Sequence, residues 1–150
     1  MAIRSYRDLD EDGKSVDAFV ALLDKIGPAT LQTWSSSGLL GYLTAIRRPE
    51  LVKGLLAVES SVTAFDAIPD NGLDALARVP IVVVIGDRAP DRVEATRAFA
   101  ERFRARGGDI TVDVLPEAGI FGNGHTLMLE KNNDVILARM VGWLAEHVYR

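Results

Sequence analysis

Residues 33–38, TWSSSG, are the first place where residue types and spacing indicate chemistry. Serine is a weak nucleophile until a neighbouring base takes its proton. Enzymes often place such a serine on a sharp turn between a strand and a helix, where only small neighbours fit. Thr33 and Ser37 stand two positions before and after Ser35 and are small, although glycine is usual at both places. A serine-rich surface loop is the alternative interpretation of this stretch.

A base and a carboxylate are available elsewhere in the chain. The base must titrate near neutrality, and a carboxylate must fix its tautomer. His125 ends a glycine-rich loop, with a surface loop histidine as the alternative; His147 lies in the last helix and is expected on the surface. Glu59 and Asp87 are carboxylates that each follow an apolar run. Glu59 has a further alternative, an ion pair with an arginine such as Arg88.

Alternating apolar runs and helical patterns predict the elements that hold these groups. The expected strands are short, apolar and bounded by turn residues: 29–33, 54–59, 80–86 and 110–115. The expected helices show apolar residues at helical spacing: 15–26, 39–46, 90–106 and a last one capped by Asn133 or Asp134. Residues 60–79 are expected to be looser, with a turn at 69–72.

Strands that alternate with helices favour parallel βαβ units with right-handed crossovers. The predicted fold class is therefore α/β, a three-layer sandwich around a mainly parallel sheet of about four strands. Ligands bind such sheets beyond the carboxyl ends of the strands. Ser35, Glu59, Asp87 and the loop that carries His125 all fall at those ends.

Composition limits the remaining classes of function. The 150 residues suit a single domain with a core, 1–150, in which 1–14 form a polar lead-in. The net charge of −4 and the absence of a basic block argue against nucleic acid as a partner. The chain has no cysteine, no apolar run long enough for a membrane span, and no apolar signal-peptide core near its start. We expect no nucleic-acid or membrane partner.

Two ligand-binding patterns are incomplete. Asp8, Asp10, Asp12 and Gly13 match the first half of a calcium loop, but Phe19 stands where that loop needs a bidentate glutamate. The glycine-rich stretch 119–124 lacks the Lys-Ser/Thr ending of a phosphate loop, which weakens a flavodoxin-like interpretation. The sequence therefore predicts neither a metal nor a cofactor.

The chain order serine, acid, histidine resembles that of the α/β-hydrolases, and the resemblance covers roughly residues 15–149. It is most similar to a branch of bacterial esterases whose elbow reads T-H-S-x-S-G. That branch has a glutamate in a V-E context after the next strand and a histidine in a G-N-x-H segment. The corresponding segments here are TWSSSG at 33–38, Val58-Glu59 and GNGH at 122–125.

The resemblance implies a role for each residue. Ser35 would be the nucleophile, His125 the general base, Glu59 the orienting acid with Asp87 as the alternative, and the amide of Ser36 an oxyanion-hole donor. The implied activity is hydrolysis of a small carboxylic ester through an acyl-enzyme. Members of the family are often secreted, so the resemblance does not fix the cellular compartment.

Two departures from the family shape the expectation. Trp34 stands where the family commonly has histidine, which changes the pocket wall beside the serine. The family also places several strands before the elbow, which residues 1–14 are too few to form. The expectation is the C-terminal half of the fold, a truncated or engineered fragment that is weak or inactive alone. The rival expectation is a non-catalytic scaffold or self-assembling module.

The same argument predicts self-association. Without a neighbour on one side, the strand at 29–33 would be an edge that templates pairing with another chain. The expected state is a homodimer formed through that edge or through the flanking helices. The alternative is that residues 1–7 fold back over the edge.

Overall fold

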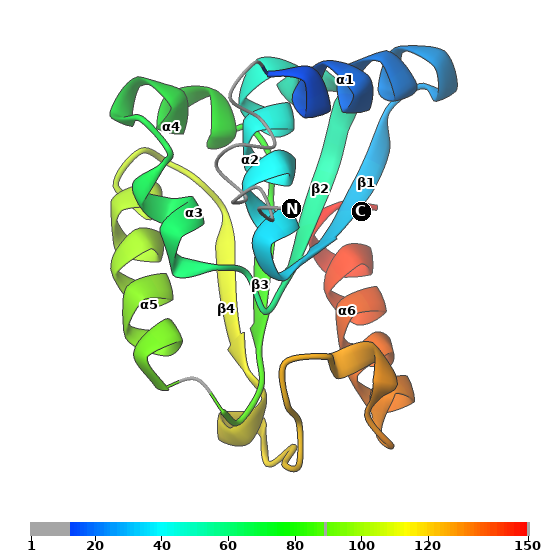
Figure 1. Cartoon of the computed structure of the whole chain (residues 1–150), viewed down its shortest axis with the longest axis vertical. Coiled ribbons are helices and arrows are strands. Elements are labelled where there is room, and N and C mark those ends of the chain that lie inside the picture. Colours follow the sequence, from blue (N-terminus) through cyan, green and yellow to red (C-terminus); the bar gives the residue numbers. More distant parts are fainter. Residues whose placement is uncertain (1–12, 89, 150) are drawn as a thin grey trace, which may run out of the picture.

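The computed structural model describes residues 13–88 and 90–149. Its centre is one four-stranded sheet in which every neighbouring pair is parallel, in the order β1-β2-β3-β4. Figure 1 shows the sheet with helices on both sides. The strands are β1 (Ala29–Trp34), β2 (Val52–Val58), β3 (Ile81–Ile85) and β4 (Ile110–Val114). The predicted α/β class and its four parallel strands are confirmed.

Helices connect the strands and cover the sheet. The α-helices are α1 (Lys14–Ile26), α2 (Gly38–Arg47), α3 (Val62–Asp66), α4 (Asp70–Leu76), α5 (Pro90–Arg104) and α6 (Asn133–His147). Short 3-10 turns occupy Ser35–Ser37, Pro49–Leu51, Leu115–Ala118 and Leu127–Leu129. Because α6 lies on one side of the sheet and the others on the opposite side, the three-layer arrangement also agrees with the prediction (Figure 1).

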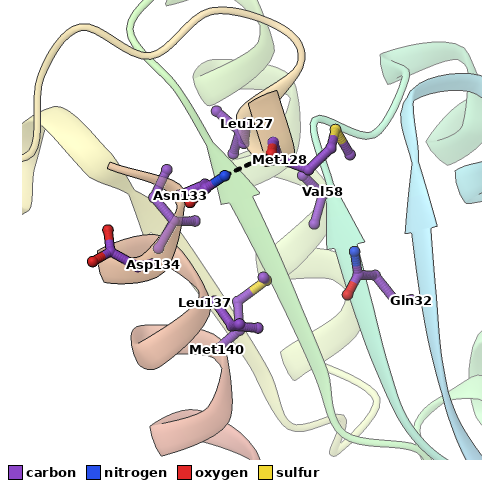
Figure 2. A pocket seen from close by; sticks show the side chains of 9 residues that line it. Gln32, Val58, Leu127, Met128, Asn133, Asp134, Leu137 and Met140 are labelled. Atoms are coloured by element: carbon purple, nitrogen blue, oxygen red, sulfur yellow. Dashed lines mark hydrogen bonds between the residues drawn. The ribbon is translucent and has the colours of Figure 1, made fainter. Parts of the chain in front are cut away.

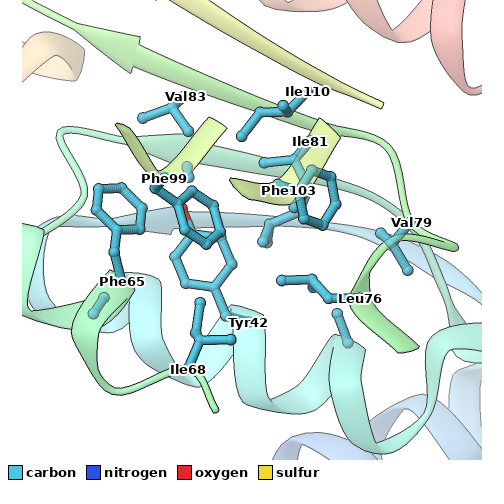
Figure 3. Close-up of a cluster of buried hydrophobic side chains, with 14 of the residues drawn as sticks. Tyr42, Phe65, Ile68, Leu76, Val79, Ile81, Val83, Phe99, Phe103 and Ile110 are labelled. Atoms are coloured by element: carbon cyan, nitrogen blue, oxygen red, sulfur yellow. The ribbon is translucent and has the colours of Figure 1, made fainter. Parts of the chain in front are cut away.

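Alternate side chains of the strands build a separate core on each face. Leu55, Ala57, Ile81 and Val83 point toward α2–α5, where aromatic rings fill the space between helices and sheet. The rings of Phe65 and Phe99 stack at 4.5 Å between centroids, and Tyr42 and Phe103 flank them (Figure 3). Burial of these large aromatic side chains contributes to the apolar stabilisation of this face.

The opposite core is smaller and depends on α6. Leu56, Val58, Val82 and Val84 point to this face. Leu127, Ile136, Met140 and Trp143 pack against them. The strands are therefore packed between two cores. This packing fixes the position of their carboxyl ends, where the candidate groups lie.

The edge strand β1 differs from the inner strands. All residues of β3 are buried, and in β2 only Lys53 is exposed, whereas β1 has one buried residue, Thr33. Within the described part of the chain, β1 pairs only with β2. Its second edge is therefore open there, as the sequence argument expected.

Residues 60–79 are more regular than predicted. The segment contains α3 and α4, and the expected turn at 69–72 is the start of α4. Leu73 and Leu76 are buried in the larger core, and their burial outweighs the poor helix propensity of Gly72. Pro69 precedes the helix, where its missing N–H costs nothing.

Several expectations fall on residues 1–12, outside the described ranges: the calcium-loop aspartates Asp8, Asp10 and Asp12, and the folding back of residues 1–7. Among the helices that the structure describes, none combines the length and apolar character that crossing a membrane requires.

Candidate active site

The four candidate groups lie at the carboxyl edge of the sheet, as the alternating topology requires. Ser35 follows β1, Glu59 follows β2, Asp87 lies just past β3, and His125 lies in the loop after β4. Ser35 and Glu59 have φ angles of 56° and 50°, the left-handed region that non-glycine residues seldom occupy. Such strained positions cluster at functional sites.

Neighbouring small residues hold the strained turn at Ser35. The Ser37 hydroxyl accepts a hydrogen bond from the Trp34 amide at 2.9 Å and donates one to the Trp34 carbonyl at 2.7 Å. Gly38 is needed because a Cβ there would lie 2.2 Å from the Ser60 hydroxyl. The serine-rich sequence therefore fits a sharp strand–turn–helix connection, with serine in place of the usual glycine.

Ser35, His125 and Glu59 form a continuous chain of polar contacts. His125 Nε2 lies 2.8 Å from Ser35 Oγ, and His125 Nδ1 lies 3.1 Å from Glu59 Oε2. Because an ionised carboxylate only accepts hydrogen bonds, Nδ1 carries the proton and Nε2 is left to accept the one from Ser35. This tautomer is the one that a serine-activating histidine needs.

Glu59 is almost completely buried, with 3% of its side chain exposed. A buried carboxylate is tolerated only with donors around it. Its Oε1 accepts a hydrogen bond of 2.5 Å from the Gly86 amide, and its Oε2 contacts Arg92 as well as His125. The predicted alternative, an ion pair with an arginine, thus coexists with the histidine contact, but the arginine is Arg92 rather than Arg88.

Arg92 and burial together disfavour the charged form of His125. Burial is the larger cause, and the nearby guanidinium adds to it, so the pKa of His125 lies below its ordinary value of 6.5. Arg92 Nη1 is also 3.4 Å from His125 Nδ1. Since both nitrogens carry protons, they share Glu59 Oε2 as acceptor and do not bond each other. His125 is therefore neutral, and able to accept a proton, over a wider pH range than an unperturbed histidine.

Asp87 holds the loop that carries His125. Its two carboxylate oxygens accept hydrogen bonds from the amides of Gly122, at 2.6 Å, and Asn123, at 3.2 Å. The Asp87 amide in turn donates to the Asn123 carbonyl at 2.9 Å. At Gly86 a Cβ would lie 2.8 Å from the same carbonyl. Of the two candidate acids, Glu59 contacts the histidine and Asp87 contacts the backbone of its loop.

Trp34 fixes His125 from the other side. The indole Nε1 donates a hydrogen bond of 2.7 Å to the His125 carbonyl, and the two ring centroids are 5.1 Å apart. Sequence reasoning treated Trp34 as a changed pocket wall and missed this contact. Only the position next to Ser35 hinted at it, because nothing in the sequence shows where the histidine loop returns.

A pocket of about 440 Å³ opens beside the serine. Ser35, Ser36 and His125 line it together with Arg88 and Arg92 at the start of α5. Ser36 is exposed, so its backbone is close to solvent at the mouth of the pocket. The polar chain of Ser35 and His125 thus faces a space large enough for a small molecule.

A second, apolar pocket of about 300 Å³ lies between the sheet and α6 (Figure 2). Gln32, Val58, Leu137 and Met140 are among its lining residues, and none of the candidate groups is. Gln32 is the lining residue that β1 contributes.

The other sequence candidates do not form a metal site. His147 contacts Asp109 at 2.8 Å and stacks on Trp143, away from Ser35. Within residues 13–88 and 90–149, no group of three or more histidine, cysteine or acidic residues is arranged to bind a metal ion.

Comparison with known proteins relates this chain to hydrolases. No family model matches the sequence. A probable secreted lipase of a fungal species, phiG, is 28% identical over an alignment 177 positions long, which covers 85% of this chain and 48% of the lipase. The chain spans about half the length of that relative.

Two solved structures are also similar. A bacterial esterase superposes with a TM-score of 0.79 at 25% identity, covering 89% of this chain and 42% of the esterase. A predicted CIB-like hydrolase from Thermoplasma acidophilum superposes with a TM-score of 0.65 at 16% identity, covering 95% of this chain and 65% of that one, and shows the fold alone. Together with the parallel sheet and the strand–turn–helix at Ser35, the similarity to the esterase shows that the chain has the fold of the α/β-hydrolases.

Proposed function

We propose that this chain is a serine hydrolase that cleaves carboxylic esters, with Ser35 as nucleophile, His125 as general base and Glu59 as orienting acid. The observation that carries the proposal is the unbroken contact chain from Ser35 Oγ through the imidazole to the buried carboxylate. The matching lipase and esterase support the choice of an ester as substrate.

The proposed reaction follows from the proton positions. His125 Nε2 takes the proton of Ser35 while Oγ attacks the ester carbonyl, and Glu59 stabilises the imidazolium that forms. The protonated imidazole then gives its proton to the departing alcohol, which leaves an acyl-enzyme on Ser35. Water, deprotonated by the same histidine, attacks the acyl group and releases the acid.

The oxyanion that forms during each attack needs hydrogen-bond donors. We assign the backbone amide of Ser36 to this role, because it follows the nucleophile at the start of the turn into α2. A single assigned donor implies slow turnover, since the loss of one such donor typically costs about 10²–10³ in rate. Activated esters, whose alcohols leave easily, are therefore the substrates of choice for a first assay.

Hydrolysis of p-nitrophenyl acetate tests the proposal. Ser35→Ala and His125→Gln should each lower the rate to the uncatalysed background. His147→Gln is the matched control, because this histidine also contacts a carboxylate, that of Asp109, but lies away from the pocket. Equal rates for the wild type and Ser35→Ala would remove the assignment and favour the rival function, a non-catalytic scaffold.

We also propose that two copies associate along β1. The supporting observation is its second edge, which is unpaired among residues 13–88 and 90–149. Exposed apolar side chains on α1 and α6 would enlarge the apolar area of such an interface. Leu22 and Ile26 of α1 and Leu137 of α6 are each at least half exposed. A two-fold dimer would pair or cover both edges at once.

A further inference from the structure

The pocket beside Ser35 carries two cationic side chains that the proposed ester chemistry does not require. Arg88 lies after β3 and Arg92 in the first turn of α5, and both line the pocket with the serine and the histidine. The ester carbonyl itself is neutral, and the charge it develops is handled at the oxyanion hole. Arg92 already contacts the buried carboxylate of Glu59, so Arg88 is the cation that needs another explanation.

Arg88 makes fewer contacts with other side chains than Arg92 does. It is exposed, and among the described residues its guanidinium has no ion-pair or hydrogen-bond partner. This contrasts with other arginines of the same region: Arg97, Arg102 and Arg106 each pair with a carboxylate. An arginine that is left without a partner at the mouth of a pocket is available to bind an anion from solution.

Arg92 contacts Glu59 but keeps N–H donors that this contact does not use. Only 20% of its side chain is exposed, and its Nη1 contacts Glu59. A guanidinium has five N–H groups in a planar fork, so this contact leaves further donors for a ligand. Burial also lowers the pKa of Arg92, because a partly desolvated cation is less favourable than one in water. A second anion would reduce the electrostatic cost of that desolvated cation.

Asp91 is the one acidic side chain that lines the same pocket. Its charge opposes an anion but does not cancel the two cations, because no ion pair joins it to either arginine within the described residues. Because Glu59 lies behind Arg92 and does not line the pocket, the lining itself carries two cations and one carboxylate, with Val62 on its apolar side.

We propose that this pocket binds the free carboxylate of an acidic ester, with Arg88 as the main contact and Arg92 as the second. The substrate class is the monoester of a short dicarboxylic acid: the ester carbonyl lies at Ser35 and the ionised end of the acyl chain lies at the arginines. The volume of about 440 Å³ accommodates such a chain. This inference rests on the proposed ester hydrolysis for its kinetics, but the carboxylate site can be tested without turnover.

Two esters of equal chain length provide the kinetic test: mono-p-nitrophenyl adipate, which ends in a carboxylate, and p-nitrophenyl hexanoate, which ends in a methyl group. The wild type should show the higher kcat/KM for the adipate monoester. Arg88→Gln should lower the adipate-to-hexanoate ratio of kcat/KM roughly fivefold, as expected for a partly exposed ion pair. Asp91→Asn should raise that ratio.

Arg97→Gln is the matched control. It removes the same charge from α5 at a position that pairs with Glu117 and lines a different pocket. This variant should leave the ratio unchanged. Hydrolysis of both esters with a ratio that Arg88→Gln does not lower would overturn the carboxylate site while leaving the ester hydrolase intact.

A binding measurement separates the two proposals. Monomethyl adipate and methyl hexanoate are titrated into Ser35→Ala, with tryptophan fluorescence as the signal because Trp34 adjoins His125. Tighter binding of monomethyl adipate, lost when Arg88→Gln is added, supports the site even if no ester is hydrolysed. Equal response to the two compounds, or no response to either, overturns it.

Discussion

The indole N–H of Trp34 donates a 2.7 Å hydrogen bond to the backbone carbonyl of His125, so the residue before the proposed nucleophile holds the proposed base. The Trp34 ring also lies at a 43° tilt to the imidazole. Since Ser35 follows Trp34 directly, the same backbone fixes both partners of the proton transfer. The distance between Ser35 and His125 therefore depends on this side chain as well as on Glu59.

Trp34→Phe tests this positioning role. Phenylalanine keeps an aromatic ring against the imidazole but loses the indole donor, and one hydrogen bond contributes about 1 kcal/mol. We expect kcat for p-nitrophenyl acetate to fall by about fivefold with little change in KM, because the attack geometry is loosened while the pocket wall remains.

Trp143→Phe is the control for Trp34→Phe. Trp143 also donates an indole hydrogen bond, 2.8 Å to the Thr111 hydroxyl, but lies in the core under α6. Both variants should lower the free energy of unfolding by a similar amount in urea titrations, and only Trp34→Phe should lower kcat. Equal losses of kcat would mean that Trp34 acts through stability alone.

The choice between the two candidate acids leads to a second prediction. Glu59→Gln keeps the shape of the side chain but removes the charge that stabilises imidazolium, and kcat should fall by about 10³–10⁴. Asp87→Asn keeps one acceptor for the Gly122 and Asn123 amides, and kcat should fall by less than about tenfold. Steady-state kinetics that show the larger loss for Asp87→Asn would assign the acid to Asp87.

The pH dependence of kcat/KM is a third prediction. The proposed reaction needs neutral His125, whose pKa is lowered by burial and by Arg92, so activity should persist in mildly acidic solution below the ordinary value of 6.5. The charged groups around this imidazole are Glu59 and Arg92 in contact, with Arg88 and Asp91 in the same pocket.

Arg92→Gln should move the acidic limb of that profile to higher pH. The substitution removes a cation that repels imidazolium and leaves Glu59 Oε2 to the histidine alone, and both changes raise the pKa of His125. Arg97→Gln, on the same helix, should leave the profile where it is. A limb that stays in place or moves to lower pH in Arg92→Gln would contradict this account of the site.

The open edge of β1 leads to a fourth prediction, about self-association. Light scattering at tens of micromolar protein should give the mass of a dimer. Leu137→Lys places a charge on α6, across the apolar pocket from Gln32 of β1 (Figure 2), and should shift the mass toward the monomer. Glu101→Lys, on the exposed side of α5, should not. A monomeric mass for the unmodified chain would refute association through β1.

Most of the fold could be predicted because its strands are apolar runs with sharp ends. The run 80–86 corresponds to β3, and Gly27-Pro28 ends α1 as expected. The helices between residues 60 and 79 were missed, since their residues have poor local propensity. Leu73 and Leu76 form a helix there because the large core on that face buries them, which is a tertiary effect.

The sequence predicts which residues form the candidate site, but it does not predict all of their contacts. Parallel topology places the ends of successive strands side by side, so Ser35, Glu59 and His125 could be expected at one edge. The contacts of Arg92 with Glu59 and of Trp34 with His125 could not be predicted. They depend on where the start of α5 and the loop that carries His125 lie relative to the sheet. The local sequence does not determine where these segments lie.

Covalent labelling with a fluorophosphonate, followed by mass spectrometry of the labelled peptide, tests the central assignment most directly. Attack by an activated serine expels fluoride and leaves a stable phosphonyl serine. We predict a single adduct on Ser35, absent from Ser36 and Ser37, lost in Ser35→Ala, strongly slowed in His125→Gln and unaffected by His147→Gln. An adduct that persists in Ser35→Ala, or a folded wild type that is never labelled, would contradict the proposal that Ser35 is an activated nucleophile.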